Sequence, residues 1–220
     1  MEKVEQRIKE RVEAQLKWDD RIKKSDIKVD VTGTTVKLEG TVPSYIALRA
    51  AESNVYMIEG VTLVENSLHI KYPEGTQVPQ DMEIESNIRN MLLWDGSIDS
   101  SNIEIIVDQG MVTLNGTVLS QWERKLAEDI AFSAKGVNGV NNNLVVNLTA
   151  DINDQIIADE IRDAIDRNPI VNSNEIEILV DQGMVTIRGN VQSYIEANAA
   201  HDAVMYTTGV RGIVDQLNIG

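Results

Sequence analysis

Hydrophobic residues recur first at helical and then at strand spacing, and the chain runs through this order three times. Each repeat opens with apolar positions three and four residues apart, which predicts an amphipathic helix with one face toward a core. These positions are Val4, Ile8, Val12 and Leu16, then Ile84, Ile88, Met91 and Leu92, and finally Ile157, Ile161, Ala164 and Ile165.

A pair of strands is expected after each of these helices. In the second repeat, residues 103–107 and 112–116 have the alternation typical of strands, and the Asp-Gln-Gly sequence at 108–110 predicts a hairpin turn between them. The first repeat has Thr34 in place of this turn glycine and Gly33 one position earlier. Its turn should therefore have a different geometry.

A serine marks the start of the second helix in each repeat. Ser120 with Glu123, and Ser193 with Glu196, have the spacing of a capping box, in which both side chains satisfy backbone N–H groups. Ser44 stands at the same place without the glutamate. A glycine ends each second helix and a last strand follows, so the order is helix, strand, strand, helix, strand. This order predicts an α+β fold in which two helices pack on one face of a three-stranded mixed sheet.

The repeats are close copies of one another. Residues 103–118 and 176–191 agree at 12 of 16 positions, and the repeat length is 76 and then 73 residues, which is the size of a small domain rather than of a solenoid unit. We predict three αββαβ domains at 1–73, 81–149 and 150–220. A linker at 74–80 separates the first two, whereas only 148–151 intervene between the last two. We assign a structural role to the glycines that recur at turns and helix ends: Gly40, Gly60, Gly116, Gly136, Gly189 and Gly209.

The charge of the chain is strongly negative and unevenly distributed. The net charge is −15, of which the first domain contributes 0, the second −6 and the third −8, with Glu74 in the linker. Acidic domains repel phosphate backbones, so no nucleic-acid partner is expected. Basic residues do cluster between 21 and 28, but four aspartates between 19 and 30 are interleaved with them. We interpret this segment as a solvated charged loop.

Composition also bears on location. The chain lacks cysteine, which excludes disulfides and thiolate metal sites. No stretch approaches the ~20 apolar residues needed to span a bilayer, and the start has no apolar run of the secretory type. The expected location is therefore the cytoplasm, while a longer form with a leader before Met1 would be directed to the periplasm.

The sequence offers no pattern of an active site. The two histidines, His69 and His201, do not recur between repeats, and no phosphate-binding loop or nucleophile elbow is present. We therefore expect no catalytic, cofactor-binding or metal-binding residues, no cofactor, and no enzymatic activity.

Tryptophan is the residue type that favours a contact function. Trp18 and Trp94 occupy equivalent positions at the end of the first helix, where the third repeat has Arg167. Trp122 lies in the first turn of a second helix, a region in which the other repeats have Tyr45 and Tyr194. Two interpretations stay open for these tryptophans. They pack at helix ends or between domains, or they are amphipathic anchors at a membrane or protein interface.

The runs GMVTLNGTV from Gly110 and GVNGVNNNLVV from Gly136, together with Trp122-Glu123-Arg124 on the serine-capped helix, resemble the BON (bacterial OsmY and nodulation) domain family. The resemblance is to its osmotically-inducible-protein form and extends over all three repeats. It implies αββαβ modules without known catalysis, so there are no catalytic residues to transfer. It also implies transport-associated roles at phospholipid membranes, envelope maintenance under osmotic stress, chaperone-like work in the periplasm and, in one relative, potassium sensing.

Three functional hypotheses follow. The first is a stress-associated binding protein that contacts membrane phospholipid or client proteins. The second is a protein that responds to weakly bound potassium or calcium, for which the acidic domains supply the charge. The third is a structural interaction protein whose sheet edges pair with partners or with other copies, so its oligomeric state is open.

Overall fold

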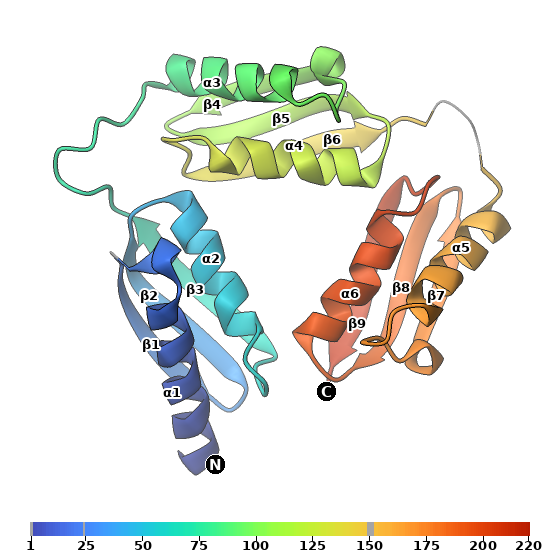
Figure 1. Ribbon diagram of the computed structural model, residues 1–220, viewed down its shortest axis with the longest axis horizontal. Helices are drawn as coiled ribbons and strands as arrows, with labels where there is room; N and C mark the ends of the chain where they lie inside the picture. Colours follow the sequence, from blue (N-terminus) through green and yellow to red (C-terminus); the bar gives the residue numbers. More distant parts are fainter. Residues whose placement is uncertain (1, 24, 149–151) are drawn as a thin grey trace.

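The computed structural model of the protein describes residues 2–23, 25–148 and 152–220. These residues form three αββαβ modules (Figure 1). Module 1 contains α1 (Glu2–Trp18), β1 (Asp26–Thr32), β2 (Thr35–Val42), α2 (Tyr45–Tyr56) and β3 (Leu63–Ile70). Module 2 contains α3 (Asp81–Trp94), β4 (Ile103–Asp108), β5 (Met111–Val118), α4 (Gln121–Ser133) and β6 (Gly139–Val146). Module 3 contains α5 (Asp154–Asp166), β7 (Ile176–Asp181), β8 (Met184–Val191), α6 (Tyr194–Met205) and β9 (Gly212–Ile219).

Each module also has a single 3₁₀ turn before its first strand, which the sequence did not predict. These turns are η1 (Asp20–Ile22), η2 (Ser100–Asn102) and η3 (Ser173–Glu175). Lys24 and residues 149–151, which include most of the predicted second linker, lie outside the described residues.

The sheets have the predicted mixed topology. In module 2 the central strand β5 pairs antiparallel with β4, with Ile103 opposite Gly116, and parallel with β6, with Gly116 opposite Leu144. The sheets β1-β2-β3 and β7-β8-β9 repeat this order. The predicted fold class, two helices on a three-stranded mixed sheet, is confirmed.

The helices bury a narrower apolar strip than the sequence suggested. Ile84, Ile88 and Leu92 are buried at four-residue spacing, but Met91, which lies about 60° around α3 from Ile88 at the edge of this strip, is 36% exposed. Val4, in the first turn of α1, is 50% exposed. Both residues were wrongly placed on the core face.

A carboxylate in the first turn of each first helix fixes the hairpin turn of its own module. Asp81 accepts hydrogen bonds from the N–H groups of Gln109 and Gly110 at 2.8 and 2.9 Å. Asp154 accepts the equivalent pair in module 3 at the same distances. In module 1 the longer Glu5 takes this place and accepts one bond, from the N–H of Gly33 at 2.8 Å.

The hairpin turns explain why module 1 has the single bond. Gln109 and Gly110 both have positive φ, at 50° and 76°, as a two-residue type I′ turn requires. In module 1 only Gly33 does, at 63°, so its turn differs in geometry as predicted.

The glycine in the middle of each second strand is required by the backbone. Gly116 has φ +120°, and a Cβ there would fall on the carbonyl oxygen of Asn102. Gly40 and Gly189 have φ +124° and +147°, and a Cβ would strike the backbone carbonyls of Asp26 and Glu175. The glycines after α2, α4 and α6 also have positive φ: Gly60 at 90°, Gly136 at 98° and Gly209 at 94°.

The predicted capping boxes are only partly formed. The hydroxyls of Ser120 and Ser193 accept hydrogen bonds from the N–H groups of Glu123 and Glu196, both at 3.2 Å. The glutamates, however, accept from the residue before the serine: Glu123 from Leu119 and Glu196 from Gln192, both at 2.8 Å. The chain therefore enters the helix along a path that brings the earlier N–H group to the carboxylate.

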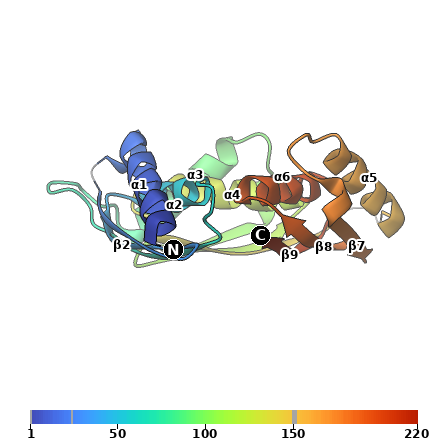
Figure 2. The same cartoon turned by 90° about the horizontal axis from the view of Figure 1, so that it is seen from below.

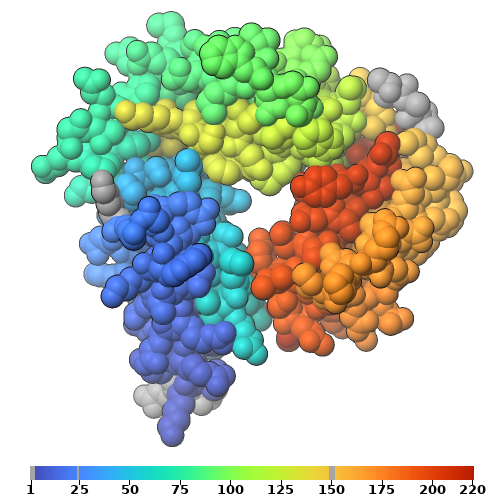
Figure 3. Space-filling model, in the orientation of Figure 1, coloured from blue at the N-terminus to red at the C-terminus, as the bar shows by residue number. Residues whose placement is uncertain are grey.

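The three modules are arranged in a ring. α2, α4 and α6 form the three sides of a triangle around the centre, and α1, α3 and α5 lie farther out (Figure 1). Seen from the side, the ring is flat, with helices toward one face and sheets toward the other (Figure 2). The space-filling view shows an opening in the middle, and module 1 in contact with module 3 at its edge (Figure 3).

Candidate interaction surface

Two tryptophans at equivalent positions are among the most exposed large apolar side chains of the described residues. Trp18 ends α1 and is 75% exposed, and Trp94 ends α3 and is 85% exposed. Leu93, beside Trp94, is 68% exposed. Both tryptophan side chains are therefore largely in solvent at the ends of their helices.

Both tryptophans end helices of the same layer. α1 and α3 belong to the helical face of the ring (Figure 2). In module 3 the last turn of α5 is followed by Arg167 at the equivalent place, so the apolar ends belong to modules 1 and 2.

Trp122 differs from the other two tryptophans. It is half-buried in the first turn of α4. The helices show that its counterparts are Ile46 and Ile195, because Tyr45, Gln121 and Tyr194 are the first residues of α2, α4 and α6. The expected match of Trp122 with the tyrosines was therefore displaced by one residue.

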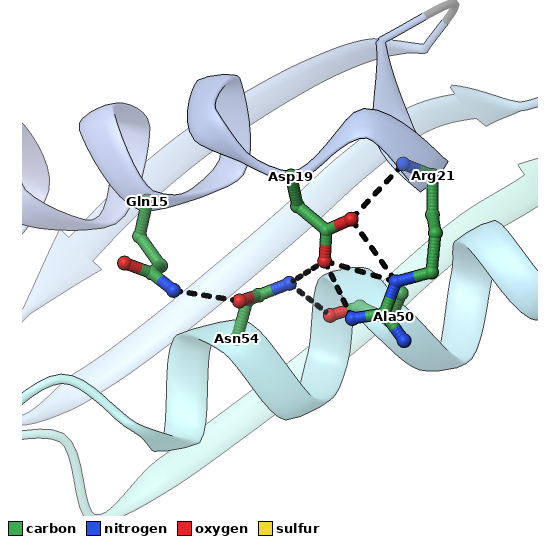
Figure 4. Close-up of polar contacts among 5 residues, drawn as sticks. All are labelled: Gln15, Asp19, Arg21, Ala50 and Asn54. Atoms are coloured by element: carbon green, nitrogen blue, oxygen red, sulfur yellow. Dashed lines mark hydrogen bonds and ion pairs between the residues drawn. The ribbon is translucent and has the colours of Figure 1, made fainter.

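The charged segment after α1 is not a solvated loop throughout. Asp19 is 6% exposed and Asn54 on α2 is 4% exposed. The Asn54 amide donates to Asp19 at 2.6 Å and to the Ala50 carbonyl at 2.9 Å, and accepts from the Gln15 amide at 2.8 Å (Figure 4). These bonds tie the end of α1 to α2.

Arg21 completes this network. Its guanidinium binds the Asp19 carboxylate through Nη2 at 2.6 Å and Nε at 3.0 Å, and its backbone N–H donates at 2.9 Å. The Arg21 side-chain hydrogen bonds hold the pKa of Asp19 well below its usual range, against the opposing effect of burial. The interpretation of Asp19 as a solvated residue was wrong, because its partner Asn54 lies 35 residues later on another helix and no local pattern connects the two.

The two histidines lie in different modules. His69 is exposed on β3 and His201 is half-buried on α6. Across the described ranges, no group of three or more histidine, cysteine, aspartate or glutamate residues is placed to hold a metal ion. Nor is any described helix long and apolar enough to cross a membrane.

The comparison with protein families accounts for this repeated architecture. The sequence profile of the BON domain matches the chain three times, at residues 5–72, 80–147 and 153–220. The chain belongs to the BON domain family. Each of the three BON matches covers all five helices and strands of a module, apart from the first residues of α1.

Two relatives share stretches of this BON sequence. The osmotically-inducible protein Y of Escherichia coli is 34% identical over 140 residues, which cover 62% of this chain and 70% of the relative. The outer membrane lipoprotein DolP of Haemophilus influenzae is 24% identical over 187 residues, covering 83% of this chain and 90% of the relative.

Among solved structures, the C-terminal domain of CdsD, a structural protein of the type III secretion system of Chlamydia trachomatis, aligns with 96% of this chain and 96% of its own length. The sequence identity is 9% and the TM-score 0.27, and at that score we base no conclusion on the likeness.

Proposed function

We propose that this protein is a non-catalytic, stress-associated binding protein of the cell envelope that contacts lipid surfaces through the helical face of its ring. The observation that carries the proposal is the exposure of Trp18 and Trp94, 75% and 85%, at equivalent ends of α1 and α3. Tryptophan has an apolar ring with one polar edge, which suits the boundary between lipid tails and headgroups.

The names of the relatives support a role in the cell envelope under osmotic stress. One is described as osmotically inducible and the other as an outer membrane lipoprotein. Module 1, with no net charge, meets no repulsion at an anionic surface, whereas modules 2 and 3 carry −6 and −8. Contact through apolar insertion fits this distribution better than attraction to anionic lipid.

Vesicle flotation of the full chain tests the proposal. The variant Trp18→Ala with Trp94→Ala is compared with Tyr206→Ala, which removes an aromatic side chain that is 65% exposed in module 3. We expect the double variant to lose about tenfold or more of its partitioning into zwitterionic vesicles, and Tyr206→Ala to keep it.

Salt and a client assay separate the alternatives. Binding by insertion should survive high salt, whereas binding through the basic residues near Arg21 should weaken as the Debye length shortens. If the double variant floats like the unmodified chain, the tryptophans are not the lipid contact. The unmodified chain could instead fail to float with vesicles but suppress the aggregation of a heat-unfolded protein. If the double variant lost that suppression, the same surface would be assigned to client proteins.

A further inference from the structure

One contact recurs at all three boundaries between modules. The first residue of each second helix is Tyr45, Gln121 or Tyr194, and we call it the docking residue. At two boundaries the docking residue contacts an aromatic residue at the far end of the second helix of another module, and at the third Gln121 lines one groove with the equivalent residue. We call this helix end the receiving end. The receiving ends carry Phe132, Met205 and Tyr56, which are equivalent residues eleven places after the start of α4, α6 and α2.

The boundary between modules 1 and 2 has an aromatic contact. The Tyr45 ring meets the Phe132 ring edge to face, with centroids 6.0 Å apart and planes at 75°. Tyr45 also packs against the core of module 2. Burial raises the pKa of Tyr45, as expected for a phenol taken out of water by a neighbouring module.

The boundary between modules 3 and 1 repeats this contact with a different ring geometry. Tyr194 stacks on Tyr56, with centroids 4.4 Å apart and planes at 19°. The two helix ends enclose a small cavity of about 120 Å³, lined by Tyr56 to Thr62 of module 1 and Gln192 to Ile195 of module 3. Burial raises the pKa of Tyr194 as well.

At the boundary between modules 2 and 3, the docking and receiving positions are occupied by residues without aromatic rings. The Gln121 amide donates to the backbone carbonyl of Arg211, which follows α6. Gln121 and Met205 line a groove of about 410 Å³ between the two modules. A polar contact therefore takes the place of the aromatic pair at this boundary.

The closing boundary shows that a linker does not impose this contact. Modules 1 and 2, and modules 2 and 3, are consecutive in the chain, so proximity alone could bring them together. Tyr56 and Tyr194 are separated by a whole intervening module, yet they meet through the equivalent positions. A head-to-tail contact that recurs with a constant rotation closes into a ring, which is the arrangement observed (Figure 3).

We propose that the docking residue and the receiving end form a recognition surface whose partner is another module of the same kind. Within the chain this surface joins module 3 to module 1 and closes the ring. A receiving end that has lost its internal partner takes the docking residue of a second copy of the chain. The linked modules give the internal contact a high effective concentration, so the intact chain stays closed and monomeric.

Thiol crosslinking tests ring closure, because the chain has no native cysteine. Met57→Cys and Ile195→Cys place thiols beside the tyrosine pair without removing it, at residues 54% and 44% exposed. A short bismaleimide should join them within the monomer about tenfold faster than it joins Met57→Cys to Tyr206→Cys, since Tyr206 follows the other end of α6. Adding Tyr194→Ala should remove this advantage. Equal rates for the two pairs, or an advantage that survives Tyr194→Ala, would overturn the proposed closure.

Mixing two opened chains tests the partner. Tyr194→Ala leaves a free receiving end on module 1, and Tyr56→Ala leaves a free docking residue on module 3. Each variant should sediment as a monomer, and an equimolar mixture should contain a dimer whose fraction rises with concentration. Circular dichroism and melting of each variant establish that both are folded. A mixture that sediments like its components over the whole soluble range would show that a second copy is not the partner.

Discussion

Module 1 and module 3 share a fold but differ in charge, in what lies between their helices and in how the first helix ends. Module 1 has no net charge, while module 3 carries −8. Asp19 and Asn54 are buried in module 1, whereas their counterparts in module 3 are Asn168 and Ala203. α1 ends at an exposed tryptophan, and α5 is followed by Arg167.

The features that modules 1 and 3 share are those that the backbone requires. Gly40 and Gly189 occupy the same strand position with the same close approach to a carbonyl group. Glu5 and Asp154 fix the hairpin turns from the same helical position. The comparison indicates that the shared features maintain the module, whereas the charge, the buried polar network and the exposed tryptophan distinguish module 1 from module 3.

Replacing the strand glycines should have the largest effect. In Gly116→Val or Gly189→Val, the new side chain overlaps a backbone carbonyl and the valine is forced to positive φ, so the module should lose more than about 3 kcal/mol of stability. Hydrogen exchange resolved by module should show loss of protection in the altered module first. Gly96→Val is the matched control, since a Cβ there meets nothing within 4 Å. Equal exchange in Gly116→Val and Gly96→Val would show that the glycine is merely tolerated.

Disrupting the buried polar network should cause the next largest loss of stability, confined to module 1. Asn54→Leu removes the amide that bonds to Asp19 and leaves a buried carboxylate with fewer partners, at a cost of about 2–3 kcal/mol. Ser53→Ala, on the exposed side of α2, should change the free energy of unfolding little. If the amide hydrogens of module 1 exchange at the same rate in the two variants, the network does not stabilise the helix pair.

The same network should make module 1 sensitive to acid. The pKa of Asp19 is lower in the folded state than its ordinary value of 3.8, so the carboxylate stabilises the fold fully above that value. Its contribution is lost as the pH falls below about 4, toward the folded-state pKa. The difference in unfolding free energy between the unmodified chain and Asp19→Asn should therefore shrink on acidification. A difference that is constant from pH 7 to pH 2 would contradict this assignment.

A small stabilisation should come from the hairpin turns of modules 2 and 3. Gln109 and Gln182 have φ of 50° and 51°, which costs about 1 kcal/mol for a residue with a side chain. Gln109→Gly should relieve part of this cost and raise the melting temperature of module 2 slightly, as seen by calorimetry. Thr34→Gly in module 1, where φ is not positive, should give no such gain.

The fold could be predicted from the sequence because its determinants are local. The alternation in 103–107, the serine caps and the glycines at helix ends each act within a few residues, and three copies confirm one another. The details that failed depend on geometry. Met91 lies at the edge of the apolar face of α3 and is exposed, and Glu123 bonds one N–H group earlier than a capping box would.

The candidate site could be predicted only in part from the sequence. The equivalence of Trp18 and Trp94 was visible in the repeat, but their exposure depends on how far each helix extends past its sheet. The tyrosine after Ser44 and after Ser193 was a signal for the module contacts, yet its partners Phe132 and Tyr56 lie in other modules. Pairing between modules depends on the arrangement of the ring, which periodicity within a repeat does not encode.

The most direct test of the account is the environment of each tryptophan on lipid. Three chains that each keep one tryptophan, with phenylalanine at the other two positions, are titrated with zwitterionic vesicles containing brominated lipid. The account predicts a blue-shifted and quenched emission for Trp18 and Trp94, and an unchanged emission for Trp122, which is half-buried in α4. On anionic vesicles the chain that keeps Trp18, in the uncharged module, should respond at least as strongly as the chain that keeps Trp94. Unchanged emission of both Trp18 and Trp94 at saturating lipid, or a response from Trp122 alone, would contradict the proposed lipid contact.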